Sequence, residues 1–497
     1  MIIKHDPDVV FPYLTDASNF SGGFADEVII PETQEELLFA VRSCIEQQKP
    51  MTIAGSGTGL SGGRVPYGGC VISTERLRAM TIDAEAMTAT VEPGLALREL
   101  QDEADRMNLL YPPDPTERNA SMGGTVSANA SGARTFKYGA TREFVRGLKV
   151  ILGTGDTMTL SRGECFADGY SLTLTTDQGA THTLSLPHLV MPTRKHAAGL
   201  YIKENMDAID LFIGSEGTLG VIAEIRVALI PKPERIIAGV IFFETITHCQ
   251  EFVATARDRS YTHRKALEEG GIGSDFDARA LEFFDEKALD FVRDHYPRIP
   301  TPCAGAVWFE QEVNDDNEQA LLQEWYELIE PHTPYLEEAW FAVSETDQES
   351  LREFRHAVPS KAYERIRELG QQKIGTDMAV PDEHFLSLYT FYLDEFSAGK
   401  FEYVIWGHIG NSHVHANIFP KNKEEYLRAK ECYARCIDKT LELRGTISAE
   451  HGVGKIKSGY LLKMYGQDII DGFRSIKHEL DPQALFGRET MFSLDAA

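Results

Sequence analysis

The chain has 497 residues, more than one hydrophobic core organises, so we expect two or three domains. Its net charge of -27 argues against binding to nucleic acid or to anionic lipid through a basic face. No apolar run reaches the roughly 18 residues that a transmembrane helix needs, and the N-terminal residues lack the apolar core of a signal peptide.

The seven cysteines, which include Cys432 and Cys436 one helical turn apart, are scattered along the chain. An odd and scattered set is typical of reduced thiols in the cytosol. No C-x2-C-x2-C run is present, so we expect no ferredoxin-type cluster. The expected location is the cytoplasm, and peripheral attachment at the inner membrane face stays open.

The first third of the chain predicts alternating strands and helices. Residues 26–57 predict strand, helix and strand, with Thr33 as N-cap and Glu36 as its capping-box partner. Residues 96–113 predict an amphipathic helix that ends before Pro112-Pro113. Residues 144–160 predict two strands that are joined by a glycine-containing turn.

Two changes in amino-acid composition along the chain predict domain boundaries. The prolines of 229–235 break any regular element there, and longer charged helices interleaved with strands follow to about residue 440. From Gly445 the chain is again glycine-rich and then predicts a helix over 468–480. We therefore expect segments at 1–230, 231–444 and 445–497.

The stretch 51–74 contains Gly57-Thr-Gly59-Leu-Ser-Gly62, which matches the dinucleotide pattern G-x-G-x-x-G. That pattern needs a helix after its third glycine, and Pro66 with further glycines excludes one here. The expected structure is strand, glycine loop, strand. Such a loop can hold a pyrophosphate with its backbone N–H groups, and a plain connection is the alternative.

Two further segments, 111–139 and 211–225, are also rich in glycine and small residues. Small residues at this density allow the backbone to approach a flat ring closely. The second of these segments leads into an apolar strand.

Residues 401–419 predict a hairpin that turns at Gly410-Asn411 and carries His408, His413 and His415. His413, His415 and Asn417 share one face of the second strand because side chains alternate with a period of two. Histidines grouped in this way suit a divalent metal, and a wet polar strand face is the alternative. A carboxylate ligand is missing locally, and Glu450, followed by His451, can supply one.

Five motifs occur in the order used by one family: GSGTGLSGG, GGTVSANASGA, GSEGTLGVI, GHIGNSHVHANI and ISAEHGVG. From about residue 25 to its end, the chain resembles the FAD-linked oxidases of the vanillyl-alcohol-oxidase type. Within them it is similar to the branch of D-lactate, glycolate and D-2-hydroxyglutarate dehydrogenases.

The resemblance implies an α+β fold. It places a two-subdomain FAD-binding domain (PCMH type) at 1–230, a cap domain with a helix-covered antiparallel sheet at 231–444, and a return to the FAD domain at 445–497. It further implies that the FAD pyrophosphate is held by Gly55, Ser56, Gly57, Thr58, Gly59, Leu60 and Ser61, and that the flavin and adenosine are lined by Pro112, Asp114, Ser121, Gly123, Gly124, Ser127, Gly132 and Ile222. Residues 54–69 contain no histidine, so we expect non-covalent FAD.

The resemblance also assigns His408, His415 and Glu450 as ligands of a divalent metal, Zn, Mn or Fe. His413 stands where relatives carry Asn, and it is either a fourth ligand or a substrate contact. We predict His451 as the general base because an imidazole titrates near neutrality, and bracing of Glu450 is its alternative role.

Arg355 is the candidate anchor for the substrate carboxylate, because its planar fork matches that group. Relatives add a lysine where Gly375 stands, and the nearest lysine here is Lys373. Pro359 replaces a hydroxyl residue of some relatives. Both departures weaken a second carboxylate site and favour D-lactate over D-2-hydroxyglutarate.

The implied reaction oxidises a D-2-hydroxy acid to the 2-oxo acid, with metal-assisted hydride transfer to flavin N5. The electrons then pass to a separate acceptor, which is a quinone, a cytochrome, an electron-transfer flavoprotein or an iron–sulfur subunit. A homodimer is left open. The alternatives are a D-2-hydroxyglutarate dehydrogenase, a flavin subunit of a glycolate oxidase, and an enzyme similar to alkyl-dihydroxyacetonephosphate synthase.

Overall fold

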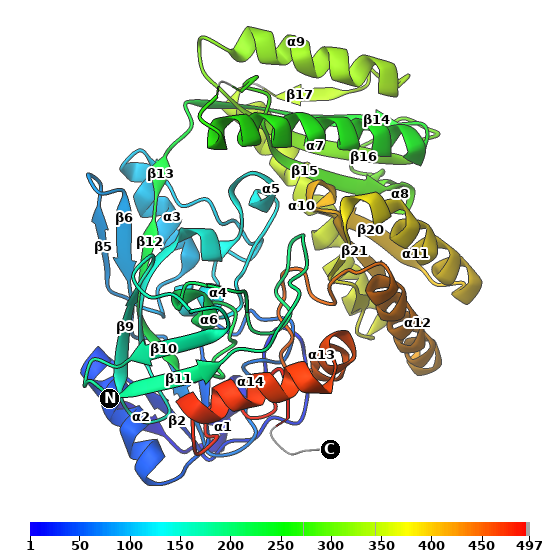
Figure 1. The fold of residues 1–497 in the computed structure, drawn as a ribbon. Coiled ribbons are helices and arrows are strands. Elements are labelled where there is room, and N and C mark those ends of the chain that lie inside the picture. Colours follow the sequence, from blue (N-terminus) through cyan, green and yellow to red (C-terminus); the bar gives the residue numbers. More distant parts are fainter. Residues whose placement is uncertain (272, 343, 494–497) are drawn as a thin grey trace. The chain divides into compact units, whose positions relative to one another are not determined.

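The computed structural model describes residues 1–271, 273–342 and 344–493, and the chain divides into two compact units (Figure 1). Unit 1 consists of Met1–Gly132, Gly139–Lys232 and Ile447–Ala497, and unit 2 of Ala133–Tyr138 and Pro233–Thr446. The mixture of helices and sheets confirms the expected α+β class. Among the described residues, no helix combines the length and the apolar character needed to cross a bilayer.

Unit 1 contains two main sheets within the described part of the chain. The first has the order β1-β2-β4-β3, and only β1 runs antiparallel to its neighbour. The second is antiparallel, with the order β5-β6-β12-β8-β9. The strands are β1 (Ile2–Lys4), β2 (Glu27–Ile30), β3 (Met51–Ala54), β4 (Cys70–Ser73), β5 (Met80–Asp83), β6 (Thr88–Val91), β7 (Leu109–Leu110), β8 (Val145–Ile151), β9 (Thr157–Ser161), β10 (Ser171–Thr175), β11 (Thr181–Ser185), β12 (Val221–Ala228) and β13 (Ile230–Pro231).

The helices of unit 1 cover these sheets and the small pairs β10-β11 and β7-β13. They are α1 (Pro7–Val10), α2 (Gln34–Glu46), α3 (Leu97–Arg106), α4 (Met122–Ser127), α6 (Ile209–Phe212), α13 (Ser458–Tyr465) and α14 (Gln467–Leu480). Although α14 is near the end of the sequence, it lies along β11, which is almost 300 residues earlier (Figure 1). Unit 1 is therefore closed by the last part of the chain.

The predicted order of elements in unit 1 is confirmed, with two differences in detail. Strand β2, helix α2 and strand β3 occupy residues 26–57, and Thr33 caps α2 by accepting from Glu36 N at 3.2 Å. The Glu36 carboxylate, however, accepts from Glu32 N instead of Thr33 N, so the predicted capping box is wrong. Its other oxygen meets the Met1 ammonium at 2.5 Å, which accounts for this orientation. Helix α3 ends at Arg106, earlier than predicted, because the chain must extend to form β7.

Unit 2 is built on an antiparallel sheet with the order β17-β14-β16-β15-β20-β21-β18, and β19 also pairs with β21. The strands are β14 (Arg235–Phe243), β15 (Ala278–Asp285), β16 (Gly305–Val313), β17 (Trp340–Ala342), β18 (Ile374–Gly375), β19 (Met378–Ala379), β20 (Tyr403–Gly407) and β21 (His413–Ile418). The helices are α5 (Thr135–Tyr138), α7 (Ile246–Glu268), α8 (Glu286–Val292), α9 (Glu318–Ile329), α10 (Glu345–Leu369), α11 (Phe385–Gly399) and α12 (Lys423–Glu442). The expected helix-covered antiparallel sheet is confirmed.

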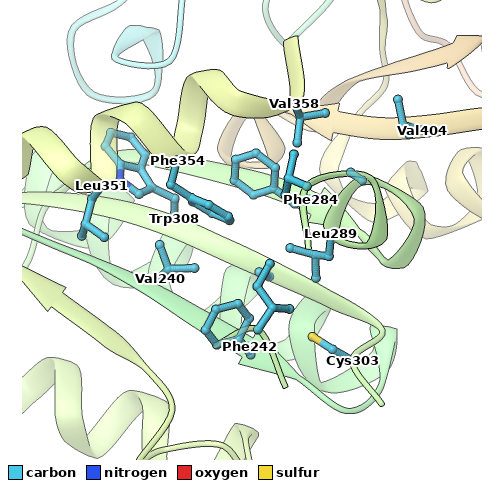
Figure 2. Close-up of a cluster of buried hydrophobic side chains, with 14 of the residues drawn as sticks. Val240, Phe242, Phe284, Leu289, Cys303, Trp308, Leu351, Phe354, Val358 and Val404 are labelled. Atoms are coloured by element: carbon cyan, nitrogen blue, oxygen red, sulfur yellow. The ribbon is translucent and has the colours of Figure 1, made fainter. Parts of the chain in front are cut away.

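Side chains on the central strands of unit 2 alternate between two buried layers. Phe242, Phe284 and Trp308 form one layer with Phe354 of α10 (Figure 2). The next residue on β16 points the opposite way, and Phe309 stacks on Trp325 of α9 with ring centroids 3.9 Å apart. The sheet is thus buried on both faces, and the charged residues of its central strands, such as Glu282 and Glu310, are buried with the apolar ones.

We predict that Phe354→Ala lowers the free energy of unfolding of unit 2 by about 3–5 kcal/mol, because it empties a fully buried aromatic site. Urea unfolding followed by tryptophan fluorescence measures this, since Trp308 and Trp340 belong to the same cluster. Tyr363→Ala, on the same helix but 59% exposed, is the matched control. Equal urea midpoints for the two variants would contradict the packing described.

Candidate active site

The loop after β3 depends on two glycines with left-handed backbones. Gly57 has φ +76° and Gly62 has φ +75°, a region that disfavours residues with a side chain. A Cβ at Gly57 would lie 2.5 Å from Arg64 Nη1, and Arg64 is held by bonds to Gly55 O at 2.9 Å and Pro12 O at 2.7 Å. No helix forms between β3 and β4, all of whose residues are described, so the predicted strand, loop and strand are confirmed.

A second glycine-rich segment lies directly against this loop. Ser121 caps α4 by accepting from Gly124 N, and a Cβ at Gly55 would lie 2.3 Å from Ser121 Oγ. Further along, a Cβ at Gly132 would lie 2.1 Å from Asp114 O. Both glycines therefore let segments of backbone meet where no side chain fits.

The remaining glycine-rich segments of unit 1 close a ring with the first two. Gly214 N donates to Val126 O at 2.9 Å, which joins the third segment to α4. The carboxylate of Glu216 accepts from Val453 N at 2.7 Å and from Gly454 N at 2.8 Å. Lys455 N then donates to Ser61 O at 3.0 Å, back in the first loop. We call these four segments, 55–62, 121–132, 214–220 and 447–457, the glycine ring.

Glu216 is an unusual residue for its position. Its backbone has φ +51°, although it is not a glycine. Burial raises its pKa to about 7, even though the N–H groups of Val453 and Gly454 and the ammonium groups of Lys457 and Lys455 act to lower it. The C-terminal segment is therefore held by a carboxyl group that titrates close to neutrality.

The predicted FAD residues all belong to unit 1. The loop after β3 contains Gly55, Ser56, Gly57, Thr58, Gly59, Leu60 and Ser61. Helix α4 and its N-cap contain Ser121, Gly123, Gly124 and Ser127, and the flanking loops contain Pro112, Asp114 and Gly132. Strand β12 contains Ile222. The glycine ring brings most of them together. Backbone amides without covering side chains suit a pyrophosphate and a flat ring, so these residues fit FAD.

Glu450 and His451, predicted as metal ligand and base, also belong to unit 1. Lys195 Nζ donates to Glu450 Oε2 at 2.6 Å and to Gly132 O at 3.2 Å, and the lysine side chain is 1% exposed. His451 Nε2 lies 3.5 Å from Glu450 Oε1. Lys195 thus ties Glu450 to the predicted flavin segment.

In unit 2, the pairing register of β15, β20 and β21 determines where His408 and His415 lie. Phe283 pairs with Gly407, so the next residues in opposite directions, Glu282 and His408, face each other. His408 Nδ1 and Glu282 Oε1 are 2.6 Å apart. His415 pairs with Trp406 across β20 and β21, and its Nδ1 lies 3.3 Å from Thr376 O.

The three histidine rings form a compact cluster. Ring centroids are 5.3 Å apart for His408 and His413, 5.5 Å for His408 and His415, and 4.6 Å for His413 and His415. One nitrogen from each ring lies within 4.8 Å of those of the other two. His413 Nε2 also meets Asp377 Oδ1 at 3.3 Å. Imidazole nitrogens at this spacing fit a transition metal.

Two predicted cations lie in the same unit as the histidine cluster. Arg355 Nε and Nη2 are each 3.2 Å from Glu282 Oε2, and the guanidinium carbon lies 5.6 Å from the ring centroid of Trp308. Lys373 Nζ donates to Asn417 Oδ1 at 2.6 Å. Burial lowers the pKa of Lys373 to about 8, so this lysine loses part of its charge in mildly alkaline solution.

Several partners of the predicted residues were not predicted from the sequence: Glu282, Lys195, and Asp377 in its contact with His413. The role of Glu216 in joining two glycine-rich segments was not predicted either. Glu282 did leave a signal, because an acidic residue stands in the middle of the strand ARALEFFD, between the apolar residues Leu281 and Phe283. Lys195 left none, since it lies in an irregular polar segment far from Glu450 in sequence.

Comparison with known proteins identifies two family matches along the chain. Residues 25–161 match the family described as "FAD binding domain", and residues 272–490 match "FAD linked oxidases, C-terminal domain". Together they include most of the residues discussed above.

The chain is similar over nearly its whole length to characterised relatives. It is 29% identical to "Glycolate oxidase subunit GlcD" of Bacillus subtilis (97% of this chain, 92% of that protein). It is 28% identical to "D-lactate dehydrogenase" of Anaerostipes hadrus (92% and 88%). It is 27% identical to "D-2-hydroxyglutarate dehydrogenase" of Xanthomonas citri pv. viticola (94% and 89%).

Among solved structures, alkyldihydroxyacetonephosphate synthase has a similar fold. The TM-score is 0.65, and the match covers 98% of this chain and 81% of the other at 16% identity. At this identity the likeness establishes the fold alone.

We predict that Gly57→Val yields protein without bound FAD, because the new side chain would meet both a left-handed backbone and the Arg64 guanidinium. The ratio of visible flavin absorbance to protein absorbance measures the loss. Gly179→Val is the matched control, since Gly179 also has a left-handed φ of +88° but no heavy atom within 4 Å of its Cβ position. A fully yellow Gly57→Val protein would refute the role of the loop.

We also predict a pH-dependent stability that originates at Glu216. Its pKa is about 7 when folded, against 4.5 as the reference value, so the native protein keeps a proton that the unfolded chain releases. The free energy of unfolding should therefore fall as pH rises between these two values. Glu216→Gln should reduce this fall, as measured by urea unfolding at about pH 5 and about pH 8 with flavin fluorescence as the reporter of unit 1. Glu164→Gln, at an exposed site of unit 1, is the control, and an unchanged slope in Glu216→Gln would contradict the prediction.

Proposed function

The chain belongs to the FAD-linked oxidases of the vanillyl-alcohol-oxidase type, in the D-lactate, glycolate and D-2-hydroxyglutarate dehydrogenase branch, and we propose that it oxidises D-lactate in a metal-assisted reaction. Residues 1–230 with 445–497 would form the FAD domain, and 231–444 the substrate domain. The product is the corresponding 2-oxo acid.

FAD is the cofactor that the matched family binds, and the glycine ring is the proposed binding site for FAD in this chain. Gly55–Ser61 would bind the pyrophosphate through backbone N–H groups. The small residues of α4 and Gly132 would accept the flat rings. Because no histidine occurs in 54–69, the proposed attachment is non-covalent.

His408, His415 and Glu450 are the proposed metal ligands, with His413 as a fourth ligand or a substrate contact. His408 and His415 both use Nδ1 for contacts inside unit 2, with Glu282 and Thr376 respectively. Nε2 is therefore the nitrogen of each ring that we propose for coordination, a common arrangement in metal sites. The nitrogen-rich set favours Zn, Mn or Fe over Mg or Ca.

One observation carries the substrate assignment. Arg355 and His408 contact the two oxygens of the same carboxylate, Glu282. A cation suited to an acid substrate therefore lies one side chain away from the histidine cluster. A 2-hydroxy acid needs both features, because its carboxylate and its α-hydroxyl are attached to the same carbon atom.

In the proposed reaction Arg355 binds and orients the substrate carboxylate. His451 accepts the proton of the α-hydroxyl, and Lys195 keeps Glu450 in place beside it. When bound, the metal supplies polarisation of the hydroxyl and FAD supplies the acceptor for the hydride. Electrons then leave to a separate acceptor, which is a quinone, a cytochrome, an electron-transfer flavoprotein or an iron–sulfur subunit.

D-lactate is preferred over D-2-hydroxyglutarate because a second carboxylate would need a second cation. Lys373 is the nearest candidate, yet its ammonium donates to Asn417 and burial lowers its pKa to about 8. It is therefore a weak partner for a distal carboxylate. D-2-hydroxyglutarate and glycolate remain the alternative substrates.

The test is an anaerobic titration of the FAD-loaded protein that follows the visible flavin band. D-lactate should bleach the band, L-lactate should not, and an added electron acceptor should restore it. The His415→Ala variant should keep its yellow colour but lose bleaching, because it removes a metal ligand. If only D-2-hydroxyglutarate or only glycolate bleaches the band, that acid replaces D-lactate as the assigned substrate. A band that no 2-hydroxy acid bleaches would refute the proposed function.

A further inference from the structure

We propose that Glu282 is a positioning residue that fixes a metal ligand and the anchor of the substrate carboxylate with one side chain. This inference rests on the proposed function and adds a residue to its site. Glu282 contacts His408 through Oε1 and Arg355 through Oε2, and its side chain is 4% exposed.

Three elements converge on Glu282 because of where it stands in the sheet of unit 2. It lies on β15, and the pairing register sets it opposite Trp308 of β16 on one side. On the other side, the register of β15 with β20 sets it opposite His408. It points to the same face as Phe284, the face that α10 covers with Phe354 and Arg355.

The contact with His408 decides which nitrogen of that ring is available. A carboxylate accepts hydrogen bonds, so the 2.6 Å contact assigns the proton of the neutral ring to Nδ1. The lone pair then belongs to Nε2, the atom that a metal would take. The negative charge of Glu282 also makes the imidazole a stronger donor to a cation.

The contact with Arg355 decides which edge of the guanidinium remains for substrate. Nε and Nη2 both lie 3.2 Å from Glu282 Oε2, while Nη1 does not take part in this pair. Trp308 adds a second constraint, since its ring centroid lies 5.6 Å from the guanidinium carbon. Two contacts thus fix the guanidinium of Arg355 beside the cross-strand pair of Glu282 and Trp308, and Nη1 is the nitrogen outside the contact with Glu282.

A glutamine cannot replace Glu282 in this arrangement. Both neighbours present N–H donors, and a glutamine offers one accepting oxygen and one donating NH2 group. Glu282→Gln therefore keeps an acceptor for only one neighbour and sets its NH2 group against the N–H donor of the other. The same substitution removes the charge that both neighbours share.

The experiment measures Mn²⁺ binding to the FAD-loaded protein, without substrate, by the loss of the free-ion EPR signal. We expect Glu282→Gln to weaken Mn²⁺ binding by about 10–100-fold, the usual effect of losing the partner of a metal-binding histidine. Glu310→Gln is the matched control. Glu310 is a buried carboxylate on the adjacent strand that pairs with Arg134 at 3.2 Å and with Arg279 at 3.4 Å.

A kinetic measurement tests the second contact. Glu282→Gln should also raise KM for D-lactate, whereas Arg355→Gln should raise KM and leave the Mn²⁺ dissociation constant unchanged. Their effects on KM should be less than additive in the double variant, because both act on the same contact. If Glu282→Gln does not fold, Glu282→Asp retains the charge with a shorter reach and should show the same two effects in smaller measure.

The outcomes separate this inference from the proposed function. Wild-type protein that binds Mn²⁺ and a Glu282→Gln protein that binds it equally well would overturn the inference and leave the metal-assisted oxidation standing. Wild-type protein that binds no Mn²⁺, Zn²⁺ or Fe²⁺ would overturn both. A selective loss in Glu282→Gln, absent in Glu310→Gln, supports the assignment.

Discussion

Unit 1 depends on a carboxylate that receives two backbone N–H groups from the far end of the chain. Glu216 accepts from Val453 and Gly454, which lie more than 230 residues later. These amides would otherwise lack partners in a glycine-rich turn that cannot form a helix or a strand. In the same turn, the backbone N–H of Lys455 donates a hydrogen bond to the carbonyl oxygen of Ser61 in the first loop. One side chain thus holds together segments that contribute little hydrophobic surface of their own.

In unit 2, charged side chains are buried in a sheet whose two faces are mostly covered by apolar side chains. Glu282 and Glu310 stand on neighbouring central strands, and each meets at least one arginine. Burying such carboxylates is costly unless every oxygen has a partner. The register of the sheet supplies these partners, because it brings His408 opposite Glu282. Strand pairing therefore positions Glu282, His408 and His415 relative to one another, and helix α10 adds Arg355.

The local parts of this structure could be predicted from the sequence, and the distant pairings could not. The absence of a helix after Gly62 followed from Pro66 and nearby glycines, and the shared face of His413 and His415 followed from strand periodicity. Glu282 and His408 are 126 residues apart, and Lys195 and Glu450 are 255 apart, so no local pattern encodes either contact. The capping box at Glu36 failed for the same reason, because the distant Met1 ammonium competes for its carboxylate. The roles of His451, Lys373 and the metal ligands stay predictions.

The split of unit 1 between both ends of the chain has a consequence for biosynthesis. The segment 447–457 completes the glycine ring, yet it leaves the ribosome only after all of unit 2 has been made. Unit 2 is nearly continuous in sequence and can fold while synthesis proceeds. The contacts that residues 447–457 make in the glycine ring can therefore form only after unit 2 has been synthesised. Binding of a cofactor by the complete ring would therefore be a late event, and we expect nascent or C-terminally shortened chains to be free of flavin.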